Sequence, residues 1–529
     1  MKVSALYLLL AAALLQQPAR SQDAAPQAGT TYGPVRGTTV DGIRVFKGVP
    51  YGATTSGANR FRAPQPPAPW TQTRDATRYG PRCYQLPAPP DADSAWRSWT
   101  DTSAMSEDCL TLSIWTPGLR DGRRRPVMVW LHGGGYSVGS GNSSINEGIR
   151  LARRGDVVVV SVNHRLNLFG YLYFAELGGA DFADTGNTGQ LDIIAALRWV
   201  KANIPEFGGD PGNVLVFGES GGGGKVGALL AMPGAQGLFH RAAMQSGFGI
   251  TVNTREKATA FAAGFLEKLG LKREQMGELR RLPPERLLRA LDDLTGGSPT
   301  AITPVLDGRH LPRHPFAPDA PALSADVPLL VGYNATETTV LFPPPWAFDL
   351  DWPGLEKQLA KEIPGMAAAE VVAGLRRERP RATPSDLYFF ITTERGMGNG
   401  ARTVAERKAG LGRAPVFLYR LAWPTPVLNG RLRTPHSLDI PMVFDNLASS
   451  TSLVGEDTSA PQKVADAMSA AWIAFARTGS PNGPGLAKWP AYDPQRRPTM
   501  TFDVVSQSVD DPLRREHAVL APWLVPPAP

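Results

Sequence analysis

A serine between glycines is the first group in this sequence that could do chemistry. It lies in GESGG at 218–222, directly after the apolar run Val214–Phe217 and directly before a helical pattern. A strand, a strained turn and a helix in that order expose the serine hydroxyl and leave helix N–H groups free to face a developing oxyanion. The motif G-x-S-x-G therefore predicts a nucleophile at Ser220, and we expect Gly221–Gly224 to offer bare backbone to an acyl group.

The hydroxyl of such a serine needs a base, and the base needs an acid to orient it. In chains with this turn the order along the sequence is serine, acid, histidine. His436, in the loop TPHSLDIPMVF beyond the last predicted strand, fits this order, whereas His517 lies near the end of the chain, past the last predicted helix. Glu337 comes a few residues after the predicted strand Val327–Gly332 and is the expected acid, while Asp307, in a turn-like LDG, is its competitor. The sequence thus predicts a catalytic triad of Ser220, Glu337 and His436.

A second glycine cluster follows the apolar run Val127–Leu131. It reads HGGG at 132–135, and its N–H groups can turn toward a carbonyl oxygen together with the N–H of Gly221. One such donor contributes roughly 3 to 4 kcal/mol to transition-state binding. We therefore expect an oxyanion hole beside Ser220.

Apolar, β-branched runs without clean alternation predict strands that are buried on both faces of a parallel sheet. They are Val127–Leu131, Val157–Asn163, Val214–Phe217, Val327–Gly332 and Val416–Trp423. Helical patterns lie between them, over Gln190–Asn203, Lys225–Ala231, Arg255–Leu269, Pro284–Leu291, Met366–Arg377 and Lys463–Arg477. This alternation predicts an α/β fold with a doubly wound, mostly parallel sheet.

Two long stretches between the predicted strands are rich in helical pattern. They lie near 253–300 and 345–412, and we expect them to form a cap over the carboxyl edge of the sheet, where ligands bind in such folds. Because large α/β folds can exceed the usual domain length, we expect residues 22–529 to form a single domain with these helical insertions.

The first 21 residues have the pattern of a secretory signal peptide. Lys2 gives the positive start, Ala5–Leu15 is an apolar run too short to span a bilayer, and Ala19 and Ser21 are the small residues before a cleavage site. We therefore expect export to the periplasm or the medium. No later run is long and apolar enough to predict membrane insertion.

Charge and cysteine content narrow the function further. The formal net charge is +7, and the basic residues form no cluster with interleaved aromatic side chains, so we expect no nucleic-acid binding. In an exported chain the two cysteines, Cys83 and Cys109, most simply form one disulfide. No histidine lies near them at ligand spacing, and the sequence predicts neither a metal site nor a cofactor.

The sequence resembles the type B carboxylesterase family, which includes bacterial carboxylesterases and the cholinesterases. FGGDPGNVLVFGESGG at 207–222 looks like the family's active-site signature, and SEDCLTLSIW at 106–115 looks like its second signature. Shorter matches are GVPYG at 48–52, RFRAPQPPAPW at 60–70, VNHRLNLFGYL at 162–172, GLFHRAAMQSG at 237–247, GYNATE at 332–337 and AWIAFARTGSPN at 471–482. The resemblance covers nearly the whole mature chain and implies an α/β-hydrolase fold.

The resemblance also implies roles for single residues of this chain. The family's nucleophile falls on Ser220, its acid on Glu337 and its base on His436. Its three oxyanion donors fall on Gly134, Gly135 and Gly221, and its first disulfide falls on Cys83 and Cys109. Further disulfides of the animal members are absent, because the chain has two cysteines.

An intact triad predicts a serine hydrolase that cleaves small-molecule carboxylic esters through an acyl-enzyme. A hydrolase of amides, carbamates or a polyester-like natural product on the same triad is the alternative, because the acyl and alcohol pockets lie in the insertions. A non-catalytic adhesion or binding protein, a class that the family also contains, would need a broken triad. The sequence predicts no oligomeric state.

Trp99, ten residues before Cys109 in WTDTSAMSEDC, is a further candidate for the site. In cholinesterases a tryptophan at the matching offset faces the catalytic gorge and holds a quaternary ammonium, so the resemblance implies that Trp99 lines the alcohol side of the pocket. An indole face near a cation contributes about 0.5 to 2 kcal/mol. The alternative is that Trp99 or its neighbour Trp96 anchors the loop by packing.

Overall fold

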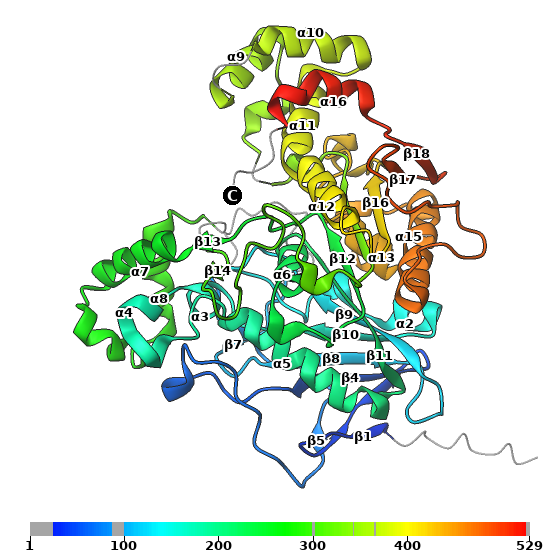
Figure 1. The fold of residues 1–529 in the computed structure, drawn as a ribbon. Helices are drawn as coiled ribbons and strands as arrows, with labels where there is room; N and C mark the ends of the chain where they lie inside the picture. The colour runs from blue at the N-terminus through cyan, green and yellow to red at the C-terminus, as the bar shows by residue number, and fades with distance from the viewer. Residues whose placement is uncertain (1–24, 87–99, 299–301, 342, 364–366, 525–529) are drawn as a thin grey trace, which may run out of the picture.

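An eleven-stranded sheet runs through the part of the chain that the computed structural model describes (Figure 1). The described residues are 25–86, 100–298, 302–341, 343–363 and 367–524. Across the sheet the strand order is β18-β17-β16-β15-β12-β11-β9-β10-β8-β4-β3. In chain order these strands are β3 (Thr38–Val40), β4 (Ile43–Pro50), β8 (Thr111–Thr116), β9 (Arg125–Leu131), β10 (Val158–Val162), β11 (Gly209–Glu219), β12 (Arg241–Gln245), β15 (Leu329–Asn334), β16 (Val416–Leu421), β17 (Pro498–Phe502) and β18 (Gln507–Asp510).

The central strands of this sheet are parallel and its two edges are antiparallel. Neighbours from β10 to β17 pair in parallel, whereas β8, β4 and β3 on one side and β18 on the other pair in antiparallel fashion. All five predicted strands are present, as β9, β10, β11, β15 and β16. Strands such as β8 (TLSIWT) and β12 (RAAMQ) escaped prediction because they mix polar or alanine positions into the strand and contain no β-branched run.

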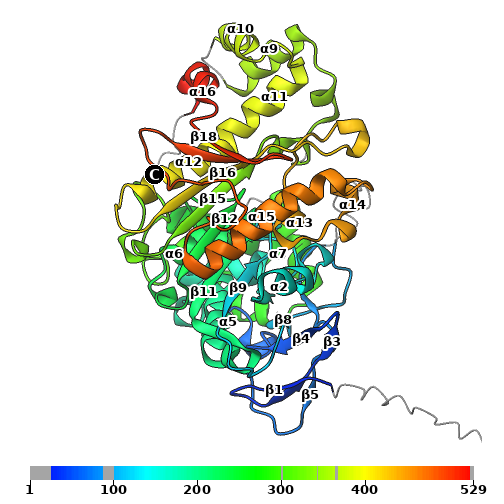
Figure 2. The same ribbon diagram turned by 90° about the vertical axis from the view of Figure 1, so that its right-hand side faces the viewer.

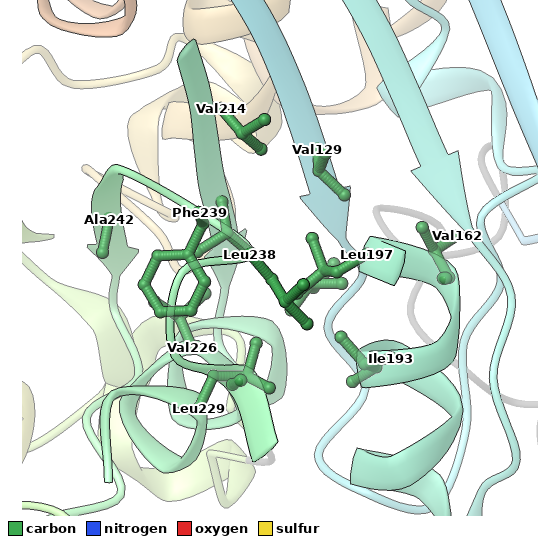
Figure 3. Packing of buried hydrophobic residues seen from close by; sticks show 14 of the residues in the cluster. Val129, Val162, Ile193, Leu197, Val214, Val226, Leu229, Leu238, Phe239 and Ala242 are labelled. Atoms are coloured by element: carbon green, nitrogen blue, oxygen red, sulfur yellow. The ribbon is translucent and has the colours of Figure 1, made fainter. Parts of the chain in front are cut away.

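Helices cover both faces of the sheet, as expected for a doubly wound fold (Figures 1 and 2). On one face, α5 (Thr188–Asn203), α6 (Gly221–Leu230) and α12 (Asn399–Ala409) contribute to a core with alternate strand residues. Figure 3 shows Ile193 and Leu197 of α5 beside Val129 of β9 in this core. On the other face lie α2 (Ile149–Gly155), α13 (Asp439–Phe444) and α15 (Ser459–Thr478).

The two stretches predicted as insertions are helical, and each contributes to a hydrophobic cluster that also includes residues from outside the stretch. The first holds α7 (Arg255–Leu269) and α8 (Pro284–Thr295), and the second holds α9 (Trp352–Glu362), α10 (Ala368–Glu378), α11 (Pro384–Thr393) and α12. Residue 366 of the helix predicted over Met366–Arg377 lies outside the described residues; the rest forms most of α10. Figure 1 shows α9 and α10 well separated from α7 and α8, with α16 (Arg514–Leu520) beside α10.

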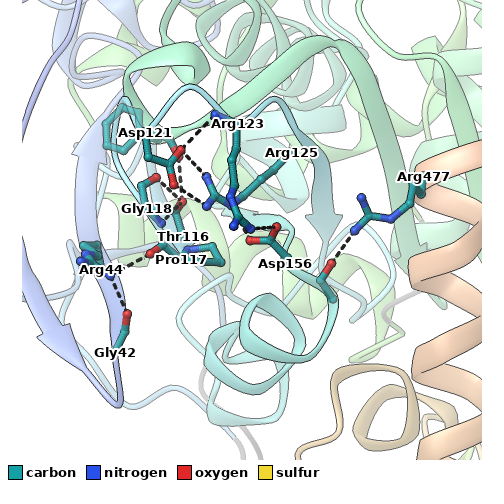
Figure 4. Close-up of polar contacts among 12 residues, drawn as sticks. Gly42, Arg44, Thr116, Pro117, Gly118, Asp121, Arg123, Arg125, Asp156 and Arg477 are labelled. Carbon is teal, nitrogen blue, oxygen red and sulfur yellow. Dashed lines mark hydrogen bonds and ion pairs between the residues drawn. The ribbon is translucent and has the colours of Figure 1, made fainter.

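A buried arginine fixes the start of β9, the strand whose other end carries the HGGG motif. The Arg125 guanidinium donates to both carboxylate oxygens of Asp121, at 2.9 and 2.6 Å, and through Nε to Asp156 at 2.7 Å (Figure 4). The hydrogen bond to Arg125 holds the pKa of the Asp121 carboxyl below its usual range. Such bidentate, charge-assisted pairs add geometric specificity, so the strand enters the sheet in a defined position.

The disulfide expected between Cys83 and Cys109 is present, with an S–S distance of 1.98 Å. Among the described residues, no helix combines the length and hydropathy that a membrane crossing requires. The predicted signal peptide, residues 1–21, lies outside the described residues, as do Trp96 and Trp99.

Candidate active site

Ser220 lies at the tip of the turn between β11 and α6. Its backbone has φ 56° and ψ −124°, a conformation that non-glycine residues rarely adopt. Its N–H donates to the carbonyl of Gln245 on β12 at 2.8 Å, which ties the strained residue to the neighbouring strand. The turn therefore has the geometry predicted for a nucleophile elbow.

The glycines around Ser220 are required by the protein's own backbone. A Cβ atom on Gly222 would lie 2.0 Å from the Leu131 carbonyl oxygen, and one on Gly223 would lie 2.4 Å from the Gly247 carbonyl oxygen. The same holds for Gly221, whose Cβ would lie 2.0 Å from the Gly135 carbonyl oxygen, and for Gly224, whose Cβ would lie 2.6 Å from Tyr136 OH. The expectation that Gly221–Gly224 leave bare backbone for an acyl group is therefore wrong at all four positions. Their Cβ positions are taken by neighbouring segments of this chain, which pack against the start of α6.

His436 and Glu337 form a buried pair at the carboxyl ends of the central strands. The Nδ1 atom of His436 lies 2.5 Å from Oε2 of Glu337. The other carboxylate oxygen of Glu337 accepts hydrogen bonds from Ser246 Oγ at 2.6 Å and from the Asn334 N–H at 2.7 Å. These bonds fix the carboxylate, which in turn orients the imidazole as a triad acid does.

The competing acid, Asp307, forms hydrogen bonds within its own turn and to Asn187. Its Oδ1 accepts the backbone N–H groups of Arg309, His310 and Leu311, and its Oδ2 accepts a hydrogen bond from Asn187. Asp307 thus stabilises the turn that its sequence context predicts.

Two buried acids near His436 were not predicted as site residues. Oε1 of Glu219 lies 3.2 Å from Nε2 of His436 and accepts a hydrogen bond from Ser437 Oγ at 2.8 Å. Asp439 accepts hydrogen bonds from Gln245 and from Tyr419 OH, at 3.0 and 2.7 Å. Glu219 is the variable position of G-x-S-x-G, and Asp439 follows His436 by three residues. Their closeness to Ser220 and His436 along the sequence was the signal that could have identified these two acids as site residues.

These carboxyl groups change the proton affinity of the His436 imidazole. Burial lowers the pKa of His436, but Glu219 and Glu337 outweigh it, and the pKa rises to about 9. Burial removes water from the carboxyl groups of Glu219 and Asp439 and so raises the pKa of both, and the neighbouring carboxyl groups add to this rise. The arrangement stabilises an imidazolium, the species that a general base becomes when it accepts the serine proton.

The HGGG segment lies next to Ser220. A Cβ atom on Gly133 would be 3.2 Å from Cβ of Ser220, and one on Gly221 would be 2.0 Å from the carbonyl oxygen of Gly135. Gly134 and Gly135 have φ values of 84° and 61°, which favour glycine. Gly221 is the first residue of α6, where N–H groups have no acceptor inside the helix. The structure thus brings Gly134, Gly135 and Gly221 together beside Ser220.

Comparison with known proteins agrees with this geometry. The model of the carboxylesterase family matches residues 24–520. The chain belongs to the carboxylesterase family. The resemblance stated from the sequence motifs is thereby confirmed, and the chain is a carboxylic ester hydrolase of the α/β-hydrolase fold.

The relatives match almost from end to end. The para-nitrobenzyl esterase of Bacillus subtilis (strain 168) is 37% identical over 503 residues, 93% of this chain and 98% of its own. The phenmedipham hydrolase of Pseudarthrobacter oxydans is 35% identical, over 88% of this chain and 93% of its own. A crystal structure of a Geobacillus stearothermophilus carboxylesterase, 37% identical, superposes with a TM-score of 0.81 and covers 93% of this chain and 99% of its own.

Proposed function

We propose that this carboxylesterase cleaves its ester through an acyl-enzyme on Ser220. His436 accepts the proton of the Ser220 hydroxyl as the oxygen attacks the ester carbonyl. The carbonyl oxygen becomes an oxyanion, which the N–H groups of Gly134, Gly135 and Gly221 stabilise. His436, oriented by Glu337, then gives the proton to the leaving alcohol.

The acyl-enzyme is hydrolysed by the same groups in reverse roles. Water takes the place of the alcohol, His436 accepts one of its protons, and the hydroxide attacks the acyl carbonyl. Collapse of the second oxyanion breaks the bond to Ser220 Oγ, which takes the proton back from the imidazolium. The acid product leaves, and every proton moved in the two half-reactions passes through His436.

The observation that carries this proposal is the strained backbone of Ser220 at the head of α6, with the buried His436–Glu337 pair at the same edge of the sheet. A positive φ at a serine costs free energy, of order 1 to 3 kcal/mol. A structural turn could avoid that cost with glycine. The strain is consistent with a position where the side chain itself is needed.

The test is Ser220→Ala, assayed on a p-nitrophenyl ester. We expect turnover to fall by about a million-fold, as in other triad hydrolases, with an unchanged circular dichroism spectrum. Ser469→Ala is the matched control, because Ser469 is a buried serine on α15 whose hydroxyl bonds to the Ala465 carbonyl. Residual turnover of Ser220→Ala close to that of Ser469→Ala would refute the proposal.

The preferred ester can be approached from the relatives. One relative is named as an esterase of para-nitrobenzyl compounds and another as a hydrolase of phenmedipham. We propose p-nitrobenzyl and p-nitrophenyl esters of increasing acyl length as the first substrates, with phenmedipham and matched anilides beside them. Faster cleavage of phenmedipham or of an anilide than of every ester would favour the alternative substrate class over carboxylic esters.

We also propose that the protein is exported and acts in an oxidising compartment. The N-terminal sequence pattern and the Cys83–Cys109 disulfide both support this location. Sequencing the N-terminus of protein from the periplasm or the medium should give Gln22 as the first residue. Recovery of full-length chain in the reducing cytosol, with free thiols at both cysteines, would contradict it.

A further inference from the structure

A buried lysine lies on the helix that follows the nucleophile. Lys225 is the charged residue of α6, GGGGKVGALL, and its side chain has no exposed surface. Its Nζ donates to the carbonyl oxygens of His132, at 3.0 Å, and of Gly135, at 2.9 Å. These two carbonyls lie on either side of Gly133 and Gly134, so one ammonium spans the HGGG segment.

Burial of a charged lysine side chain at this position costs free energy. It lowers the pKa of Lys225 to about 7, against the favourable charge of Glu219. The stacked rings of His132 and His164 lie nearby, and burial together with Lys225 lowers the pKa of both, so they are neutral at pH 7. An apolar side chain of similar length would fill the same core position without this cost. The lysine therefore needs a reason beyond packing.

The Gly135 carbonyl oxygen, which accepts a hydrogen bond from Lys225, also explains why residue 221 is glycine. A Cβ atom at position 221 would lie 2.0 Å from the Gly135 carbonyl oxygen and 2.5 Å from its Cα. Gly221 is a helical residue without a positive φ, so space, and not backbone conformation, requires the glycine. Lys225 and Gly221 thus act on one peptide of the oxyanion segment from two directions.

We propose that Lys225 is the positioning residue of the oxyanion hole: its two hydrogen bonds hold the segment 132–135 against the head of α6, and Gly221 is side-chain-free to allow that approach. This inference rests on the proposed acyl-enzyme mechanism. An oxyanion forms in the transition state and not in the bound ester, so a displaced donor lowers kcat and leaves KM nearly unchanged. This split separates positioning from a general loss of folding.

The first experiment compares Lys225→Met with Lys225→Gln. Methionine fills the core without donating to either carbonyl, and we expect kcat to fall about 10- to 100-fold, part of the loss seen when a whole oxyanion donor is removed. Glutamine keeps an N–H donor for one carbonyl and should recover part of the loss. Wild-type kcat in the methionine variant would overturn the proposal, and so would a rise in KM that accounts for the whole loss of kcat/KM.

Lys408 on α12 offers a matched control. It is buried, its pKa is lowered by burial to about 8, and its Nζ donates to the carbonyl oxygens of Ser324 and Ala325. Lys408→Met therefore removes the same kind of group from the same kind of contact, away from the HGGG segment. We expect the two variants to change thermal stability to a similar extent, but Lys408→Met should keep kcat; an equal fall of kcat in both would assign the effect to stability.

The second experiment is a double-mutant cycle with Gly221→Ala. In the wild-type background the new methyl group collides with Gly135, so kcat should fall by at least about 100-fold, the effect of losing a donor. In the Lys225→Met background the released segment can move away, and the same substitution should cost at least tenfold less. Additive effects would overturn the coupling. If Ser220→Ala is inactive while Lys225→Met is normal, this inference fails and the proposed function stands.

Discussion

In the part of the chain that the structure describes, glutamate meets histidine in two buried clusters, and the groups around these clusters carry opposite charges. The cluster that contains the proposed base, which we call the catalytic cluster, consists of Glu219, Glu337, Asp439 and His436, and its acids outnumber the imidazole. In the second cluster, Glu394 contacts cationic and neutral partners from several elements: Arg402 Nη1 and His517 Nε2, each at 2.8 Å, Tyr333 OH at 2.8 Å and Arg420 Nε at 4.0 Å. We call this second group the α16 anchor, because His517 belongs to α16.

The two environments move a buried carboxyl group in opposite directions. Burial raises the pKa of Glu219, and its acidic neighbours add to this effect. Burial would also raise the pKa of Glu394, but His517 and the guanidiniums of Arg402 and Arg420 outweigh it and hold the pKa far below its ordinary value. A proton can therefore move within the catalytic cluster, whereas the α16 anchor keeps a fixed charge. Burial alone therefore does not distinguish a catalytic acid from a structural one; the sign of the charge on the neighbouring groups does.

The largest effect should come from the triad acid. Glu337→Gln removes the charge that orients His436 and stabilises the imidazolium, so we expect kcat to fall by about ten-thousand-fold with the fold retained. Steady-state kinetics on a p-nitrophenyl ester measure this. Asp307→Asn is the control, since Asp307 caps a turn, and should retain near-native kcat. The reverse ranking of the two variants would make Asp307 the acid.

Substitution in the α16 anchor should lower the free energy of unfolding and leave kcat nearly unchanged. Glu394→Gln leaves the positive charges of the anchor uncompensated, and breaking a buried pair from one side costs about 3 kcal/mol or more. Urea unfolding should show this loss of the free energy of unfolding, while kcat remains within about twofold of wild type, the scatter of a neutral substitution. A loss of kcat as large as that of Glu337→Gln would remove the distinction between the clusters.

An ion pair beside the anchor, between a partly buried glutamate and an exposed arginine, provides its control. Glu378 on α10 lies 3.8 Å from Arg515 on α16, and the Arg515 side chain is 83% exposed. Because exposed pairs contribute little, Glu378→Gln should change the free energy of unfolding by less than about 0.5 kcal/mol. A loss equal to that of Glu394→Gln would mean that charge at the α10–α16 contact, and not burial, stabilises this region.

The smallest expected effect is a shift of the pH profile. His436 acts as a base when neutral, so activity falls as the pH drops through its pKa, which its carboxylate neighbours raise to about 9. The base thus titrates above the range of 6.5 to 7 that an unperturbed histidine would suggest. Glu219→Gln removes one neighbouring charge, lowers the pKa and should move the acidic limb of kcat/KM to lower pH by about one unit.

The same measurement on the α16 anchor sharpens the comparison. Glu394→Gln changes a charge that is not part of the catalytic cluster, so its acidic limb should coincide with that of the wild type. An unmoved limb in Glu219→Gln, or an equal shift in both variants, would show that Glu219 does not set the pKa of His436.

The catalytic cluster and the α16 anchor also differ in how far the sequence predicts them. The sequence proposes Ser220, Glu337 and His436 because a motif and the order along the chain restrict the choice, and the structure places Glu337 and His436 in contact. Glu394 had no such signal: its partners come from β15, β16, α12 and α16, which the fold alone brings together. Glu219 stood inside the motif, but the sequence does not show that its carboxylate reaches the base.

The fold shows the same division. The doubly wound sheet and α7, predicted over Arg255–Leu269 and observed over the same residues, follow from local patterns. The antiparallel edge strands and the polar strand β12 depend on pairing between distant segments, which periodicity does not report. The glycine run 221–224 predicted a close approach, but only the packed structure shows that the approaching groups at Gly222 and Gly223 are the chain's own carbonyls.

The most direct test of the central claim, that Ser220 is the nucleophile and depends on the His436–Glu337 pair, is covalent labelling with a fluorophosphonate followed by peptide mass spectrometry. The account predicts one adduct, on Ser220, that is absent in Ser220→Ala and forms much more slowly in Glu337→Gln than in Glu394→Gln. An adduct on another serine of the wild-type protein, or equal labelling rates in the two glutamate variants, would contradict it.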